Sequence, residues 1–132
     1  MHIRTIIIDD HPTLIRFWKS NYFVNDMDGK RRFQLFLVKN PELSVLIEEN
    51  GEILGTALGS FDGRRGYIQK VVTAKKFRNK GIGKQLVTEV IKRLRTIGTL
   101  YIPISVEEKN VSFYTTCGFK KTSQVPMNMN VS

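Results

Sequence analysis

One amphipathic segment constrains the fold of this chain more than any other feature. Residues 81–97 carry apolar side chains at the three- and four-residue spacing of a helix; these are Ile82, Leu86, Val87, Val90, Ile91 and Leu94. Gly98 follows this run, at a position where helices commonly end. Short apolar runs of strand length flank the helix at 67–73 and 100–106. A strand, a helix and a strand in this order predict a parallel β-α-β unit.

The residues ahead of this unit predict an antiparallel meander. Two apolar runs, 43–47 and 53–60, flank Asn50-Gly51, a dipeptide that supplies the positive φ angles of a tight hairpin turn. A second turn at 62–66 leads into the next strand. The same criteria predict strands at 3–8 and 119–129. They also predict three helices, of which one begins near Pro12, one spans 29–39 and one spans 107–117. The predicted fold class is α/β with a mixed sheet, in which the meander joins the parallel β-α-β unit and helices flank both.

Length, composition and cysteine content narrow the class of protein. The 132 residues suit one domain, and no repeat or linker divides them, so we expect a single domain over 1–132. The one cysteine, Cys117, excludes an internal disulfide and a Cys-based zinc site, and it fits a reducing compartment. No apolar run reaches the ~18 residues of a membrane span, and the first apolar stretch is too short for a signal peptide. We therefore expect a cytoplasmic protein without a metal centre or a membrane partner.

Positive charge concentrates around the start of the amphipathic helix. The net charge is +9, and residues 70–95 hold nine Lys and Arg against the single acid Glu89. Within this region, Arg-Asn-Lys-Gly-Ile-Gly-Lys at 78–84 joins a strand to the helix N-terminus. The first N–H groups of a helix have no partner inside it, and the helix dipole adds positive potential there. This loop therefore predicts a phosphate-binding site.

Two common phosphate loops do not fit these residues. A nucleoside-triphosphate loop of the Walker A type needs glycine where Arg78 stands and Ser or Thr where Gln85 stands. A dinucleotide-binding fingerprint needs a third glycine where Leu86 stands. An NTPase and an NAD enzyme are therefore disfavoured.

The loop instead resembles the coenzyme A pyrophosphate loop of the GNAT superfamily of N-acetyltransferases, in which Arg or Gln is followed by Gly-x-Gly. Here the pattern is Arg78-x-x-Gly81-x-Gly83. Phe-Tyr-Thr-Thr-Cys-Gly-Phe at 113–119 resembles the late Phe-Tyr-x-x-x-Gly-Phe signature of the same family. With the order of elements, the resemblance covers residues 3–130 and is greatest to small stand-alone bacterial members, whose relatives include RimI-type acetylators of protein N-termini. It implies the GNAT fold and transfer of acetyl from acetyl-CoA to a primary amine of a small molecule, peptide or protein N-terminus.

The resemblance also implies the residues of the site. Backbone groups of Val71, Val72 and Thr73 would bind the pantetheine arm, and one of these amides would stabilise the thioester oxygen. Tyr114 would protonate the departing thiolate while the amine attacks directly, without a covalent enzyme intermediate. The pyrophosphate would be held by the loop residues Arg78, Asn79, Lys80, Gly81, Ile82, Gly83 and Lys84.

Some residues depart from the family pattern. The asparagine that contacts coenzyme A usually stands seven residues before the tyrosine, where this chain has Glu107. Either Asn110, four residues before Tyr114, takes that role because the helix is shorter, or the asparagine is absent. The usual strand glutamate is also missing, since Gln69 and Ser105 stand near its positions. The general base stays open among Glu107, Glu108 and a chain of water molecules.

Two alternatives compete with the enzyme hypothesis. A small basic nucleic-acid-binding domain could use the same Lys and Arg surface, although no binding motif is present and aromatic residues do not alternate with the cations. A GNAT domain that binds coenzyme A without turnover would also fit the missing acids. Trp18 lies in the early helices that, in this family, wall the acceptor site, so it is a candidate there. An exposed last strand would favour a homodimer.

Overall fold

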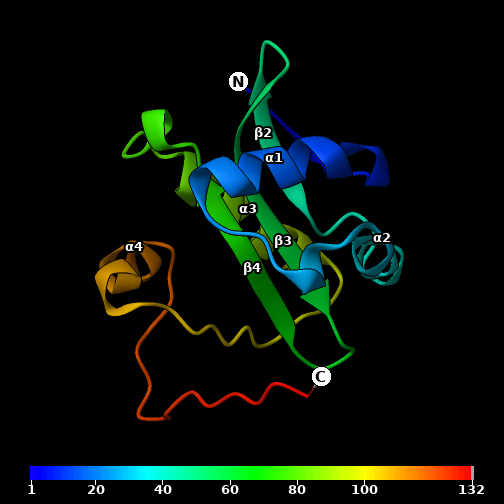
Figure 1. Cartoon of the computed structure of the whole chain (residues 1–132). Helices are drawn as coiled ribbons and strands as arrows, with labels where there is room; N and C mark the ends of the chain where they lie inside the picture. Colours follow the sequence, from blue (N-terminus) through cyan, green and yellow to red (C-terminus); the bar gives the residue numbers. More distant parts are fainter. Residues whose placement is uncertain (132) are drawn as a thin grey trace.

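The computed structural model describes residues 1–131, which form an antiparallel sheet covered by helices (Figure 1). The sheet has the order β1-β2-β3-β4, and every neighbouring pair is antiparallel. Its strands are β1 (His2–Thr5), β2 (Val45–Glu49), β3 (Glu52–Phe61) and β4 (Gly66–Thr73). The helices are α1 (His11–Asn21), α2 (Lys30–Lys39), α3 (Ile82–Thr96) and α4 (Val111–Thr116). Short 3-10 turns occupy Ile8–Asp10, Asp26–Asp28, Lys75–Phe77 and Glu108–Asn110.

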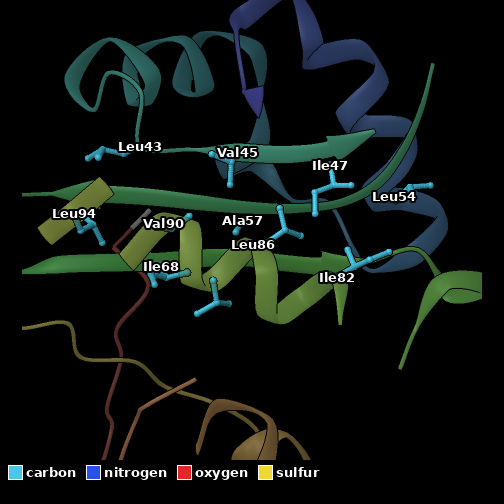
Figure 2. Packing of buried hydrophobic residues seen from close by; sticks show 11 residues of the cluster. Leu43, Val45, Ile47, Leu54, Ala57, Ile68, Ile82, Leu86, Val90 and Leu94 are labelled. Atoms are coloured by element: carbon cyan, nitrogen blue, oxygen red, sulfur yellow. The ribbon is translucent and has the colours of Figure 1, made fainter. Parts of the chain in front are cut away.

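An apolar cluster covers each face of the sheet. On one face α3 packs its predicted apolar stripe against β2, β3 and β4 (Figure 2). Leu86, Val87 and Val90 of this stripe are completely buried. On the other face α1 and α2 bury Trp18 and Phe33 against the sheet. Since neighbouring strand residues point to opposite faces, each inner strand serves both clusters.

The tight approach of α3 depends on Gly59 in β3. A Cβ atom at this position would collide with the backbone carbonyl oxygen of Leu43 and would lie 2.7 Å from Cγ1 of Val90. We expect Gly59→Ala to destabilise the protein by about 2 kcal/mol, because overpacking forces the backbone to shift. Gly29→Ala is the matched control, since its Cβ would come no closer than 3.5 Å to its nearest neighbour. Urea unfolding measures both, and equal stabilities would contradict the prediction.

The meander and its first turn confirm the prediction made from the sequence. Asn50 and Gly51 adopt φ angles of 53° and 77°, as the tight hairpin turn requires. The turn sets the register in which Glu49 pairs with Glu52. The α/β fold class is therefore confirmed, with the sheet, α1, α2 and α3 close to their predicted positions.

Two predicted strands are wrong. In the described chain, residues 100–106 and 119–129 belong to no strand, so the parallel partner of β4 is missing and the sheet is antiparallel. Among residues 1–131 the backbone hydrogen bond that joins 100–106 to β4 runs from the Gly66 N–H to the Tyr101 carbonyl (2.9 Å). Pro103 then interrupts the run, because proline has no N–H to donate to a ladder. Beyond that point the chain diverges from β4 toward α4 and leaves an open strand edge (Figure 1).

Candidate active site

The open edge of β4 borders two cavities. The first, here named the α2 cavity, has a volume of about 690 Å³ and is walled partly by α2 and the connection between α1 and α2. The second, the tail cavity, has about 990 Å³ and is walled partly by residues of the C-terminal tail. Both are lined by Ile68, Gln69, residues 104–106 and Tyr114. Tyr114 therefore stands where the two cavities meet beside β4.

A bulge in β4 shapes this edge. Thr56 pairs with Val72 and Leu58 with Gln69, so Lys70 and Val71 together oppose one residue of β3. Lys70 has a φ of 49°, which is uncommon for a residue with a side chain. The hydroxyl of Thr56 donates to the Lys70 carbonyl at 2.8 Å and so satisfies a group that the bulge removes from the ladder.

At the bulge the Lys70 side chain points toward α1 and forms a buried ion pair. The Lys70 ammonium lies 3.0 Å from the Asp28 carboxylate, and both side chains are about nine-tenths buried. It also donates to the Phe23 carbonyl at 2.8 Å and lies 5.0 Å from the Trp18 ring centroid and 4.4 Å from that of Phe23. This lysine thereby ties residues 22–28, one wall of the α2 cavity, to the strand edge.

The last residues of β4 offer hydrogen-bonding groups to the open edge. The Ala74 N–H donates to Leu54 in β3 at 2.8 Å. Because successive residues of a strand alternate the side to which their backbone groups point, Val72 also faces β3, whereas Val71 and Thr73 face outward. Of the three predicted pantetheine-binding residues, Val71 and Thr73 therefore direct backbone groups to the edge, where the Thr73 carbonyl accepts a hydrogen bond from Arg78.

The loop at 78–84 presents a row of free amides. In the described chain, no protein acceptor bonds the backbone N–H of any residue from Asn79 to Lys84, and the first bond of α3 runs from Gln85 to the Gly81 carbonyl (3.1 Å). Asn79 and Gly81 adopt positive φ angles of 63° and 81°. Lys80, between them, does not have a positive φ. An alternation of positive and negative φ angles turns successive N–H groups toward a common centre and makes a concave anion site.

The side chain of Arg78, in the same loop, donates hydrogen bonds to backbone carbonyls outside the loop. Its guanidinium donates to the carbonyl of Asn21 at 3.3 Å and lies 3.5 Å from that of Thr73. These contacts join the loop to the ends of α1 and β4. The predicted loop residues are thus brought together at the start of α3, with the Arg78 side chain directed to backbone carbonyls.

Gly83 brings this loop into contact with α4. A Cβ atom on Gly83 would lie 3.1 Å from the Phe113 ring and 3.5 Å from the Thr73 hydroxyl. The Phe113 ring in turn meets Tyr114 edge-to-face, with 4.8 Å between centroids, and Phe119 meets Tyr114 from another side at 5.9 Å. The late Phe-Tyr signature and the Gly-x-Gly loop are therefore adjacent in space, and the aromatic neighbours fix the tyrosine ring.

Among the described residues that line the two cavities, Tyr114 is the one whose pKa is strongly raised. Burial raises the pKa of Tyr114 to about 12, and the nearby Cys117 and Tyr22 add to the shift. Its hydroxyl has no hydrogen-bond partner among residues 1–131, yet the residue lines both cavities. The group is therefore neutral at physiological pH and free to donate a hydrogen bond into the cleft.

The acids predicted as alternative bases occupy different surroundings. Glu107 and Asn110 line the α2 cavity together with Tyr114, and the Asn110 side chain caps no backbone group of α4. Glu108 lines neither cavity, and its carboxylate lies 3.4 Å from Lys121. Glu107 also lies near an exposed lysine, Lys109, at 3.5 Å, so its position at the α2 cavity alone favours Glu107 over Glu108.

Two other residues have structural roles. Trp18 is completely buried and its indole N–H donates to the Thr56 hydroxyl at 3.0 Å, so it has a packing role and is excluded as a candidate for the acceptor wall. Burial raises the pKa of the Cys117 thiol, against the opposing influence of Thr116 and Lys84. This thiol stays protonated and is a poor nucleophile.

Comparison with known families and proteins identifies the family and the fold. Residues 10–119 match the acetyltransferase (GNAT) family. This chain is a GNAT acetyltransferase. It is 30% identical over 118 residues to an acetyltransferase of Photorhabdus laumondii, a match that covers 89% of this chain and 82% of the relative. It is 31% identical over 115 residues to an acetyltransferase of Pectobacterium atrosepticum, with 83% and 79% covered.

Solved structures show the same GNAT fold. Glucosamine-6-phosphate N-acetyltransferase from Arabidopsis thaliana superposes with a TM-score of 0.77 at 22% identity, over 99% of this chain and 98% of that one. PaiA N-acetyltransferase from Thermoplasma acidophilum, solved in complex with coenzyme A, gives a TM-score of 0.77 at 17% identity, over 94% and 92%. Among residues 1–131 no helix combines the length and apolarity needed to cross a bilayer, and no group of three potential metal ligands gathers.

Proposed function

We propose that this GNAT protein transfers the acetyl group of acetyl-CoA to a primary amine by direct attack of the amine on the thioester. The observation that carries the proposal is that three features lie next to one another beside the open edge of β4. These are the free amides at 79–84, the outward backbone groups of Val71 and Thr73, and the unpaired hydroxyl of Tyr114. Together they fit a long ligand with a diphosphate at one end and a reactive thioester at the other.

Coenzyme A would be held by backbone groups along most of its length. The amides from Asn79 to Lys84 suit the pyrophosphate, because amides at a helix N-terminus favour negative charge. Val71 and Thr73 suit the pantetheine arm, which would extend the sheet where the predicted parallel strand is missing. Asn110 lines the α2 cavity together with Val71, from the start of α4.

The chemistry follows from the groups beside this arm. The outward N–H of Val71 is positioned to stabilise negative charge on the thioester oxygen. Tyr114 donates its hydroxyl proton toward the sulfur as the thiolate leaves. Glu107 takes the proton that the attacking nitrogen must lose. An α-amine, whose pKa is about 7.7–8.0, loses its proton more readily than a lysine side chain, whose pKa is about 10.4. It therefore suits a weak general base such as the largely exposed carboxylate of Glu107.

Reversing one charge at the loop tests the proposal. Lys84→Glu should raise the dissociation constant of acetyl-CoA about tenfold, because a carboxylate would face the pyrophosphate. The fold should be unaffected, since an acid in the first turn of a helix is favourable. Lys92→Glu is the control, because this exposed residue lies later on α3 and changes the net charge equally.

Thermal stabilisation by acetyl-CoA gives the affinity, and thiol release in the presence of an amine panel gives turnover. No stabilisation of the wild-type protein by acetyl-CoA would overturn the proposal. Stabilisation without thiol release for any amine would leave a domain that binds coenzyme A without catalysis. A stabilisation by DNA that disappears with added salt would favour the nucleic-acid hypothesis.

Three further expectations stay predictions. Protein N-termini belong in the amine panel beside small amines and peptides, as expected for RimI-like relatives. A cytoplasmic location is expected from the single cysteine. A homodimer is expected because Val125, Met127 and Met129 are each at least 80% exposed in the tail, and light scattering over a range of concentrations measures it.

A further inference from the structure

The α2 cavity has an uneven distribution of charge that the proposed proton donation by Tyr114 does not explain. Five charged residues line it, namely Asp28, Arg32, Lys39, Lys70 and Glu107. Lys70 and Asp28 neutralise each other across 3.0 Å, with both side chains nearly buried. The other charges of the lining are two cations on α2 and one acid, Glu107, on the wall that also carries Tyr114. The Glu107 carboxylate lies 3.5 Å from the ammonium of Lys109, an exposed residue that does not line the cavity.

The two cations share one face of α2. Arg32 and Lys39 are seven residues apart, which is two helical turns or about 10 Å along the axis. Leu35 and Phe36 lie between them and line the same cavity. Neither cation has an acidic partner in the part of the chain that the structure describes. This face thus presents two unneutralised cations around an apolar strip.

The opposite wall has the reverse polarity. Glu107 lines the cavity beside Asn110 and Tyr114, where the proposed reaction places the attacking amine. An ammonium group entering the cavity is attracted to this acid and repelled by α2, so an acceptor enters with its amine toward Tyr114. A second group of the acceptor that reaches α2 is most favourable when it is negatively charged.

We propose that the acceptor is a primary amine that also carries an anionic group, a carboxylate or a phosphate, which Arg32 and Lys39 bind while its apolar body contacts Leu35 and Phe36. This inference rests on the proposed function and adds the class of acceptor. Arg32 forms paired hydrogen bonds with either anion, whereas Lys39 acts as a point charge.

Matched pairs of amines test this inference. The probes are ω-amino carboxylates of increasing chain length, their neutral primary amides, and aminoalkyl phosphates, each with acetyl-CoA and thiol detection. At the best chain length, kcat/KM for the carboxylate or the phosphate should exceed that for the amide about tenfold. The favoured anion identifies which of the two the site accepts, and added salt should reduce the preference.

Substitutions on α2 locate the preference. Arg32→Gln and Lys39→Gln should each lower the anion-to-amide ratio of kcat/KM about three- to tenfold, through KM rather than kcat. Lys30→Gln is the control, because Lys30 is an exposed cation of the same helix that does not line the cavity. The control should keep the full ratio.

The outcomes separate this inference from the proposed function. Thiol release with equal kcat/KM for amides and anions, or a ratio that survives both substitutions, overturns the inference and leaves the acetyltransferase function intact. Absence of thiol release with every amine contradicts the proposed function instead. In that case NMR titration of the coenzyme A-loaded protein with one carboxylate and its amide still decides the inference, and equal affinities overturn it.

Discussion

Tyr114→Phe is expected to lower kcat about 100-fold, the size of effect typical of a lost general acid. The phenylalanine ring would keep its edge-to-face contacts with Phe113 and Phe119, so stability should change little. The KM for acetyl-CoA should also change little, because the backbone amides at 79–84 hold the diphosphate. Stopped assays of thiol release over a range of both substrates measure these parameters.

The raised pKa of Tyr114 adds a test by pH. With a pKa of about 12, the hydroxyl keeps its proton throughout the range in which the protein is assayed. The wild-type kcat should therefore not fall from loss of this proton between about pH 8 and 10, where an unperturbed phenol of pKa about 10 would begin to ionise. A decline in kcat with a midpoint near pH 10 that disappears in Tyr114→Phe would contradict this assignment.

A matched substitution controls for the loss of a hydroxyl. Tyr67 lines the tail cavity, but its hydroxyl donates to Asp62 at 3.1 Å. Tyr67→Phe should keep kcat within about twofold, since it removes a bond at an exposed turn. If Tyr114→Phe behaves like Tyr67→Phe, the Tyr114 hydroxyl takes no part in the reaction and the ring has a packing role.

The features that the sequence predicted correctly are those that neighbouring residues determine. The spacing of apolar residues in α3 and the Asn50-Gly51 turn depend on a few consecutive positions, and both are present as expected. The loop at 79–84 depends only on glycine placement and on the helix that follows. A signature of seven consecutive residues predicted Tyr114 as a site residue. The structure places it next to Phe113, which lies near Gly83 of the loop, and its role in the reaction stays a prediction.

The wrong strands show where local composition was insufficient. Residues 100–106 have the apolar content of a strand, but Pro103 removes an N–H in the middle of the run, a signal that the sequence already held. The bulge in β4 at Lys70 and Val71 also breaks the regular edge that a parallel partner would need. Consequently the cleft that forms the candidate site lies where a regular sheet was predicted.

The contacts around Lys70 could not be predicted from the sequence, because they join residues that are far apart along the chain. Asp28 and Lys70 are 42 residues apart, and Trp18 and Thr56 are 38 apart. One local sign did exist, since the in-and-out alternation of strand residues breaks at Lys70-Val71-Val72. That sign indicates a bulge but says nothing about which carboxylate meets the lysine.

The largest expected effect on stability is the loss of this ion pair. Asp28→Asn should destabilise the protein by about 3 kcal/mol, because the Lys70 ammonium would stay nearly buried without a compensating charge. The Asn25 N–H, which Asp28 accepts at 3.0 Å, can still bond to an amide oxygen, so the loss reports mainly on the charge. Urea unfolding at neutral pH measures the difference.

A double-mutant cycle completes this prediction. Lys70→Met alone should also destabilise, whereas the double variant Asp28→Asn with Lys70→Met should regain most of the loss, giving a coupling of about 2 kcal/mol. Lys76→Met is the control, since Lys76 and Glu52 form an exposed pair at 2.9 Å that should contribute less than about 1 kcal/mol. A coupling as small as that of the exposed pair would show that Lys70 does not hold residues 22–28 against β4, and the α2 cavity would then lack its fixed wall.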